Sequence, residues 1–396
     1  MTMLAGTPFH SRTAPLVRAQ TWRRWAGHQI ASSYDPHPDR EYAAVRNSAA
    51  LFDVSPLFKY RVTGKDAARL LDRMVTRDVM KCAVGQVLYT PWCDADGKVI
   101  DDGTISRLDE STYRLTSAEP NMRWLSMCGR GMDVKIEDVS ADTGALALQG
   151  PLAREILRAA GADVDGLKYF RLTHTAIRKT PVTISRTGYT GDLGFEIWVD
   201  APNAVAVWDA LMEVGPSYGI CPAGIWALDI ARIEAGLVML DVDYYSSHRA
   251  LIEDQKSSPY ELSLDWTVAD HKGPFNGRQA LRDEKKGGSA WKFVGVEIDW
   301  VAFEKLHQER GLAPHVPNIA WRASAPLLRY GQQVGYCTSG TWSPLLKKYI
   351  ALGHVNAQHG DAGTQLELEM TVEHRRQRPL ATVRALPFFD PPRKRV

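Results

Sequence analysis

The pattern of apolar residues changes near Gly273, and this change constrains the fold more than any other feature of the sequence. Before it, strand-like segments are interleaved with segments of helical periodicity. After it, the pattern turns to short strand-like segments separated by turn residues, such as WKFVGVEID, YIALGHV and QLELEMTV. A mixed region followed by a run of strands predicts separate domains. We therefore expect an α+β protein with an all-β C-terminal domain.

The length of 396 residues also requires several domains, because one domain usually contains about 100–200 residues. We expect three domains, with the N-terminal segment free to pack against the second; they span residues 1–141, 142–272 and 273–396. We expect a strand over 50–64 and an amphipathic helix over 65–79. Residues 302–326 are rich in Pro, Arg and His, which indicates a surface insertion or linker.

Composition excludes several classes of function. A net charge of +2 gives no support to nucleic-acid binding, and no apolar run reaches the ~18 residues of a membrane span. Five scattered cysteines indicate reduced thiols in a cytoplasmic protein, and the scattered histidines predict no metal site. The N-terminus is Arg-rich and acid-poor, as in a transit peptide, and the terminal PPRKRV is expected to be a disordered tail.

The stretch ISRTGYTGDLGFEIWV, residues 184–199, places a carboxylate in an apolar strand after a glycine-rich loop. It is not a dinucleotide fingerprint, because the glycine spacing differs and a strand follows. Every second residue from Phe195 to Val199 shares one face, and Glu196 and Trp198 share the other. Glu196 is either a solvent-face residue or the acceptor of two hydrogen bonds from a flat heterocycle such as a pterin.

The stretch DADGKVIDDGT, residues 94–104, contains the strong hairpin-turn signal Asp96-Gly97. It does not fit an EF-hand, because the required oxygen ligands are missing. After the turn, Asp101 shares a strand face with apolar residues, and a buried carboxylate needs partners. Asp101 is therefore satisfied by N–H groups of the turn or serves a site, and Asp102 is expected to be the solvated member of the pair.

Eight stretches together resemble the glycine-cleavage T-protein (aminomethyltransferase) family, which also includes tetrahydrofolate-dependent demethylases. In chain order they are RNSAALFDVS, TGKDAARLLDRMVTRDV, YTPWCDADGKVIDDGTISRL, TGYTGDLGFEIWV, ARIEAGLVML, SSPYELSLDWTV, GPFNGRQAL and TSGTWSPLLKKYIALGHV. The resemblance implies a three-domain cloverleaf of two ferredoxin-like α/β domains and a C-terminal β-barrel, with tetrahydrofolate in a central hole. The N-terminus also resembles the family's entry segment, which favours a part of the fold over a transit peptide.

The resemblance assigns roles to particular residues. Asp101 matches the first Asp of the family's IDD motif and would be catalytic, and Glu196 corresponds to the pterin-binding carboxylate. The expected folate-contacting tyrosines are Tyr89, Tyr169 and Tyr189. Candidate substrate-binding residues are Tyr244, Tyr245 and His248, for which an exposed surface loop is the alternative.

The sequence departs from the family's pattern at three places, all of which belong to the part expected to bind the substrate. Ser55 is followed by Pro56 and Leu57 instead of His and Met, Leu228 replaces the Arg of an ARD motif, and MLDVDYYSSHR at 239–249 replaces LYG(H/Q)E. We therefore expect first a demethylase or methyltransferase that moves a methyl group from S, N or O of a small substrate to folate N5. An aminomethyltransferase that acts on a lipoyl carrier protein comes second, and a non-catalytic folate-binding protein comes third.

Overall fold

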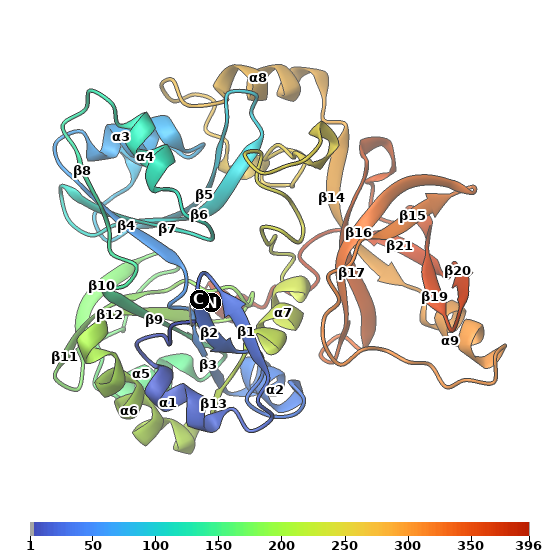
Figure 1. The fold of residues 1–396 in the computed structure, drawn as a ribbon, viewed down its shortest axis with the longest axis horizontal. Coiled ribbons are helices and arrows are strands. Elements are labelled where there is room, and N and C mark those ends of the chain that lie inside the picture. The colour runs from blue at the N-terminus through green and yellow to red at the C-terminus, as the bar shows by residue number, and fades with distance from the viewer. Residues whose placement is uncertain (1–3, 396) are drawn as a thin grey trace.

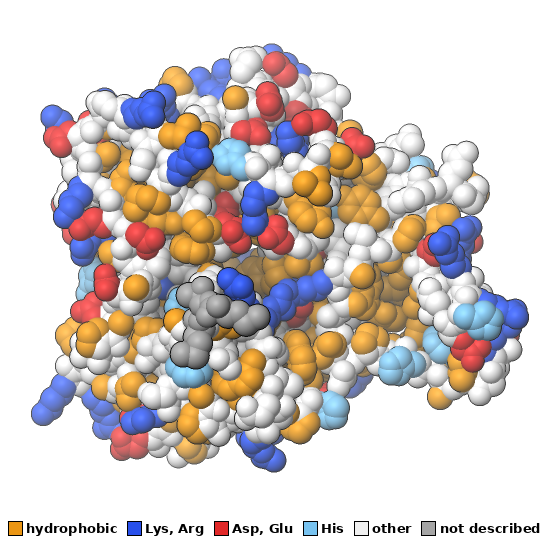
Figure 2. All heavy atoms as spheres, in the orientation of Figure 1, with side chains coloured by type: hydrophobic (Ala, Val, Ile, Leu, Met, Phe, Trp, Pro, Cys, Tyr) orange, Lys and Arg blue, Asp and Glu red, His pale blue; other side chains and the backbone are white. Residues whose placement is uncertain are grey.

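The computed structural model describes residues 4–395, which form three lobes around a hollow at the middle of the face in Figure 2. Two open sheets and a closed C-terminal barrel confirm the expected α+β fold class. Figure 1 shows the six-stranded sheet at the lower left, the five-stranded sheet at the upper left and the barrel at the right. Within residues 4–395, no helix combines the length and apolar character that crossing a membrane would take.

The six-stranded sheet joins the N-terminal part of the chain to its middle. Its order is β10-β11-β12-β9-β3-β13, and only the β13–β3 pair is parallel. Helices α5 and α6 pack on one face together with Phe195 and Ile197, and α2 and α7 pack on the other with Trp198. This confirms the predicted alternation along β12. The elements are α1 (His10–Thr13), α2 (Asp39–Asn47), β3 (Ala49–Asp53), β9 (Thr143–Gln149), α5 (Ala153–Ala159), β10 (Leu172–Ile177), β11 (Thr180–Ser185), β12 (Gly194–Asp200), α6 (Ala204–Val214), β13 (Ile220–Pro222) and α7 (Ile225–Glu234).

The five-stranded antiparallel sheet has the order β5-β6-β7-β4-β8. Helices α3 and α4 cover one face, where Leu70 and Leu71 are fully buried. The expected hairpin turn at Asp96-Gly97 joins β5 to β6, and Gly97 has a φ of +74° there. The elements are β4 (Phe58–Thr63), α3 (Ala67–Met74), β5 (Val87–Cys93), β6 (Val99–Arg107), β7 (Thr112–Ser117), α4 (Met122–Cys128) and β8 (Lys135–Asp138).

The barrel closes in the order β14-β17-β16-β15-β18-β21, with β21 paired to β14. Small hairpins β1–β2 and β19–β20 and helices α8 and α9 lie outside it. The elements are β1 (Trp22–Trp25), β2 (His28–Ala31), α8 (Arg278–Gly287), β14 (Trp291–Ile298), α9 (Trp300–Gln308), β15 (Ala325–Arg329), β16 (Gln332–Ser343), β17 (Lys348–Asn356), β18 (Gln365–Leu368), β19 (Met370–Val372), β20 (Arg375–Gln377) and β21 (Leu380–Arg384).

The expected single strand over 50–64 is wrong, because the segment forms β3 and β4 in two different sheets. The backbone N–H of Ser55 donates to Asp53 Oδ1 at 3.1 Å, and Pro56 has no N–H to continue a ladder. The chain therefore leaves the first sheet here and enters the second. We propose that the domain boundaries follow the sheets, so that residues up to Asp53 belong with residues 142–272.

Residues 302–326 are half-buried or exposed apart from Phe303 and His307, as expected for a surface segment, but they and the C-terminal residues also contact other parts of the molecule. Residues 302–326 begin within α9, and Arg322 Nε donates to Asp229 Oδ2 of α7 at 2.7 Å. Residues 391–395 do not form a disordered tail, and Val396 lies outside the described residues. Arg393 forms an ion pair with the buried Asp192 at 2.7 Å, because that carboxylate needs cations once it is removed from water.

Candidate functional site

Asp101 lies on β6 with its side chain on the helix-covered face of the five-stranded sheet, and it is fully buried. Its Oδ1 accepts from the N–H of Asp102 at 2.8 Å. Its Oδ2 accepts from the N–H of Glu119 at 3.1 Å and from Nδ2 of Asn121 at 2.9 Å. Burial and the adjacent Asp102 raise the pKa of Asp101 well above its ordinary value despite these donors. The predicted need for partners is met by the loop after β7.

Asp102 is half-buried and is therefore the more exposed member of the pair, as expected, but hydrogen bonds also hold its carboxylate. The hydroxyl group of Tyr244 donates to its carboxylate, and Tyr89 lies close enough to interact with it electrostatically. Tyr189 lies close enough to Asp102 and Tyr89 to interact electrostatically with both, and its hydroxyl donates to the carbonyl of Val238. Asp102 faces the inter-sheet side because successive strand residues alternate. Three tyrosines thus surround the second carboxylate of the pair.

Glu196 lies on β12, on the face of the six-stranded sheet opposite the α5–α6 core. Thr187 Oγ1 donates to its Oε2 at 2.5 Å, and Ser185 Oγ lies 2.8 Å from Thr187 Oγ1. Burial raises the pKa of Glu196, and the nearby Arg114 of β7 opposes that rise. Glu196 is therefore not a free solvent-face carboxylate. It sits where the six-stranded sheet faces the five-stranded sheet.

Three other predicted site residues lie outside these clusters. Tyr169 packs edge-on against Phe170 with ring centroids 4.7 Å apart, and Lys394 lies over its ring. Tyr245 is 43% exposed and pairs through its backbone with Lys256. His248 packs against Trp124 of α4 with centroids 5.0 Å apart. Of the three substrate-side candidates, only Tyr244 contacts a carboxylate of the Asp pair.

Two of the departures from the family pattern lie in one apolar cluster. Leu228 is 6% exposed within the α2–α7 core, and Leu57 and Tyr189 pack against the same cluster. Leu228, which occupies the position of the family's Arg, therefore contributes an apolar surface beside Tyr189. Arg322 from the 302–326 segment reaches the neighbouring residue Asp229 instead.

A buried ion network joins α7 to the barrel beneath this apolar surface. Arg232 Nε donates to Asp229 Oδ1 at 2.8 Å, and Arg232 Nη1 donates to Asp243. Asp243 Oδ1 also accepts from Thr338 and Ser339 of β16, at 2.5 Å and 3.0 Å. The network therefore combines the Asp229–Arg232 pair of α7 with Asp243, which lies in the same loop as Tyr244. The network fixes the position of that loop.

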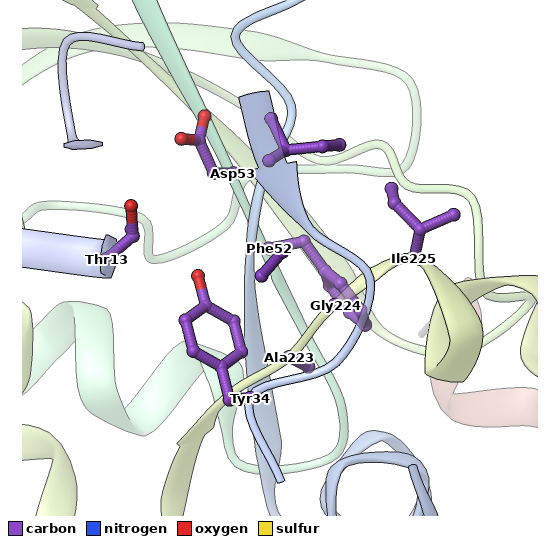
Figure 3. A pocket seen from close by; sticks show the side chains of 9 residues that line it. Thr13, Tyr34, Phe52, Asp53, Ala223, Gly224 and Ile225 are labelled. Atoms are coloured by element: carbon purple, nitrogen blue, oxygen red, sulfur yellow. The ribbon is translucent and has the colours of Figure 1, made fainter. Parts of the chain in front are cut away.

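Figure 3 shows a small pocket apart from these groups, between the N-terminal segment and the end of β3. The hydroxyl groups of Thr13 and Tyr34 and the carboxylate of Asp53 point toward the same space. Asp53 already accepts hydrogen bonds from Thr7 and from the backbone of Ser55. The pocket is therefore part of the packing of the N-terminus. No group of three or more His, Cys, Asp or Glu within residues 4–395 could hold a metal ion.

Comparison with protein families shows what class of protein this is. The pattern of the GCVT N-terminal domain matches residues 10–272, and that of the glycine cleavage T-protein C-terminal barrel domain matches residues 310–390. Together with curated relatives named aminomethyltransferase, these matches make the chain a transferase. It belongs to the glycine cleavage T-protein family.

Several curated relatives are named aminomethyltransferase. The chain is 34% identical to that of Halothermothrix orenii, over 83% of this chain and 86% of the relative. It is 34% identical to that of Bacillus pumilus, over 88% and 89%. The crystal structure of glycine cleavage system aminomethyltransferase T from Bartonella henselae has the same fold, with a TM-score of 0.83 and 24% identity, covering 98% of this chain and 99% of that one.

Sequence reasoning missed Asp102 and Arg114. Alternation places Asp102 opposite Asp101, but it does not reveal that a second sheet covers that face. Arg114 lies in the sequence YRLTS, where an arginine between apolar residues is typical of an exposed strand face. In the structure it is 6% exposed. The signal available in the sequence was a charged residue, Arg114, in the middle of a strand-like segment.

Proposed function

We propose that this protein is a tetrahydrofolate-dependent one-carbon transferase whose site lies between the two sheets and the barrel. The observation that carries the proposal is that two half-buried carboxylates, Asp102 on β6 and Glu196 on β12, lie on the sheet faces that are turned toward each other, with the buried Asp101 next to Asp102 in the chain. A pterin presents adjacent N–H donors, and Glu196 is an acceptor whose position is fixed by Thr187. Arg114 adds buried donor atoms without partners next to Glu196. These groups fit a reduced pterin.

Each residue has a distinct role in this proposal. Glu196 would bind the pterin edge, and Tyr89 and Tyr189 would pack around the ring. Asp101 would orient the reacting nitrogens, stabilise positive charge near them and relay a proton. Tetrahydrofolate supplies the nitrogen that accepts the one-carbon group. Holding both reactants in line contributes ~7–11 kcal/mol to such a transfer. Tyr169 stays a proposed folate contact at the edge of the site.

The comparisons support aminomethyl transfer better than the demethylation that we expected first. Relatives with this name align over most of the chain, and the reaction would require a lipoyl carrier protein as partner. Aminomethyl transfer is therefore the first reaction to test. Demethylation of a small methylated substrate is the second candidate, because Leu228 stands where the family pattern has an Arg and Leu57 packs against the same apolar cluster.

One assay separates the two reactions. Purified protein is incubated with tetrahydrofolate and either an aminomethyl-loaded lipoyl carrier or a panel of methylated sulfonium, amine and aryl-ether compounds. Folate products are then separated by chromatography. Turnover with the carrier alone establishes aminomethyl transfer, and formation of 5-methyltetrahydrofolate from a panel compound establishes demethylation. Folate binding without turnover of any substrate would support the non-catalytic alternative.

Replacing Glu196 with Gln is expected to weaken tetrahydrofolate binding by about tenfold or more. One acceptor oxygen becomes an N–H₂ donor that faces a donor edge, which costs about 1–3 kcal/mol. Calorimetric titration measures the effect. Glu137→Gln is a matched control, because Glu137 lies on the outer strand β8 with its side chain 28% exposed. Equal affinities of wild type and Glu196→Gln would remove Glu196 from the pterin site.

A further inference from the structure

Arg114 is a buried guanidinium with unused donors. It lies on β7, it is 6% exposed, and its Nε and Nη2 have no hydrogen-bond partner among residues 4–395. Nearly all buried polar groups in folded proteins have partners, because an unsatisfied donor retains its full desolvation cost. Burial accordingly lowers the pKa of Arg114 to about 10. An orphaned group of this kind needs an explanation.

The neighbours of Arg114 hold it in place without satisfying it. Its guanidinium lies over the ring of Trp198, with its central carbon 3.9 Å from the ring centroid. Stacking of this kind fixes the plane of the guanidinium and leaves its N–H groups at the edges. The ammonium of Lys59 lies close enough to repel it and already donates to three backbone carbonyls. The surroundings therefore favour an added acceptor.

The charge of Glu196 favours the ionised form of Arg114. The two side chains do not hydrogen bond to each other, and Glu196 Oε2 accepts from Thr187 instead. Glu196 and Trp198 lie on the same face of β12, so the carboxylate and the stacked guanidinium lie side by side. Together they present an acceptor next to a donor across the space between the sheets.

We propose that Arg114 donates a hydrogen bond to the 4-oxo group of the pterin while Glu196 accepts from N3–H and the 2-amino group. This inference rests on the proposed function and extends it, because two residues instead of one would recognise the edge of the pterin. That edge carries one acceptor followed by two donors, which is the complement of a guanidinium followed by a carboxylate. Arg114 thereby selects 4-oxo over 4-amino pteridines, since a 4-amino group would face a donor with a donor.

The test compares folic acid with its 4-amino-4-deoxy analogue in calorimetric titrations of the full-length protein. Wild type is expected to bind folic acid more tightly. Arg114→Met is expected to lower the affinity for folic acid about tenfold or more, because a charged donor is lost, and to lower the affinity for the analogue less. The ratio of the two affinities therefore falls. If Arg114 only packs against its neighbours, Arg114→Met would lower the affinities for both ligands equally and leave their ratio unchanged.

Arg61→Met is the matched control, since Arg61 is the cross-strand neighbour of Arg114 and its side chain is 50% exposed. It is expected to keep the wild-type ratio. Unchanged folic acid affinity in Arg114→Met, or an equal loss for both ligands, would overturn the inference even if Glu196→Gln weakens binding. Failure of the wild type to bind either tetrahydrofolate or folic acid would overturn the proposed function as well. Thermal unfolding of each variant without ligand verifies that it is folded.

Discussion

Replacement of Asp101 with Asn is expected to lower kcat by about two orders of magnitude or more, while tetrahydrofolate still binds. The carboxylate is fixed by three N–H donors, from Asp102, Glu119 and Asn121, so its position in the site does not depend on its charge alone. A general acid–base group contributes about 10²–10⁴-fold to a rate, and the isosteric amide cannot take up a proton. Binding is expected to persist because Glu196 and the tyrosines remain.

The dependence of kcat on pH provides a second readout for Asp101. Burial and Asp102 raise its pKa, so the active carboxylate is lost as pH falls through a value above the ordinary one for Asp. The rate of wild type is expected to fall on that acidic side, and the residual rate of Asp101→Asn is expected to lack this limb. Because the folded-state pKa exceeds the unfolded one, the folded state binds the extra proton, and this group's contribution to stability declines as pH rises through that window.

The Asn side chain also places an N–H₂ group against one of the existing N–H donors. This costs about 1–3 kcal/mol of stability, so kinetics and titrations are run well below the lowered Tm. Asp96→Asn is the matched control, since Asp96 is exposed in the turn of the same hairpin. A kcat of Asp101→Asn within a few-fold of wild type would exclude Asp101 from the chemistry.

The local part of the site could be predicted from the sequence. The alternation of side chains along a strand predicted that Glu196 and Trp198 lie on the same face. The apolar residues that share a strand face with Asp101 indicated that its carboxylate needs hydrogen-bond partners. Both signals lie within a few residues. They depend only on strand geometry, which the hydrophobic pattern specifies.

The contacts between lobes could not be predicted, because residues distant in the chain make them. Arg393 pairs with Asp192 across 201 positions, so a basic terminus that looks like a free tail is tied to a buried acid. The hydrogen bond from Tyr244 to Asp102 could not be predicted, because Tyr244 lies 142 positions away in the sequence. A break in one apolar run at Ser55 and Pro56 likewise moves the chain between two sheets. Tertiary packing decides each of these features.

Replacement of Arg232 with Met is expected to lower the free energy of unfolding by about 3–5 kcal/mol, the usual cost of leaving a buried charge without its partner. The Arg232 guanidinium is fully buried between Asp229 and Asp243. Asp229 would keep Arg322, whereas Asp243 would keep only neutral donors from the backbone of Met239 and from β16. Asp243 would therefore be left buried without a charged partner.

Urea unfolding measures the expected loss of stability in Arg232→Met, with Arg12→Met as the control variant. Arg12 pairs with Asp209 with both side chains nearly half exposed, so the loss of this pair is expected to cost far less stability than the loss of Arg232. Adding Asp243→Asn to Arg232→Met is expected to restore part of the stability, because the unpaired charge is removed. A loss near that of Arg12→Met would show that the network does not hold α7 to the barrel. The loop carrying Asp243 and Tyr244 would then depend on other contacts for its position beside Asp102.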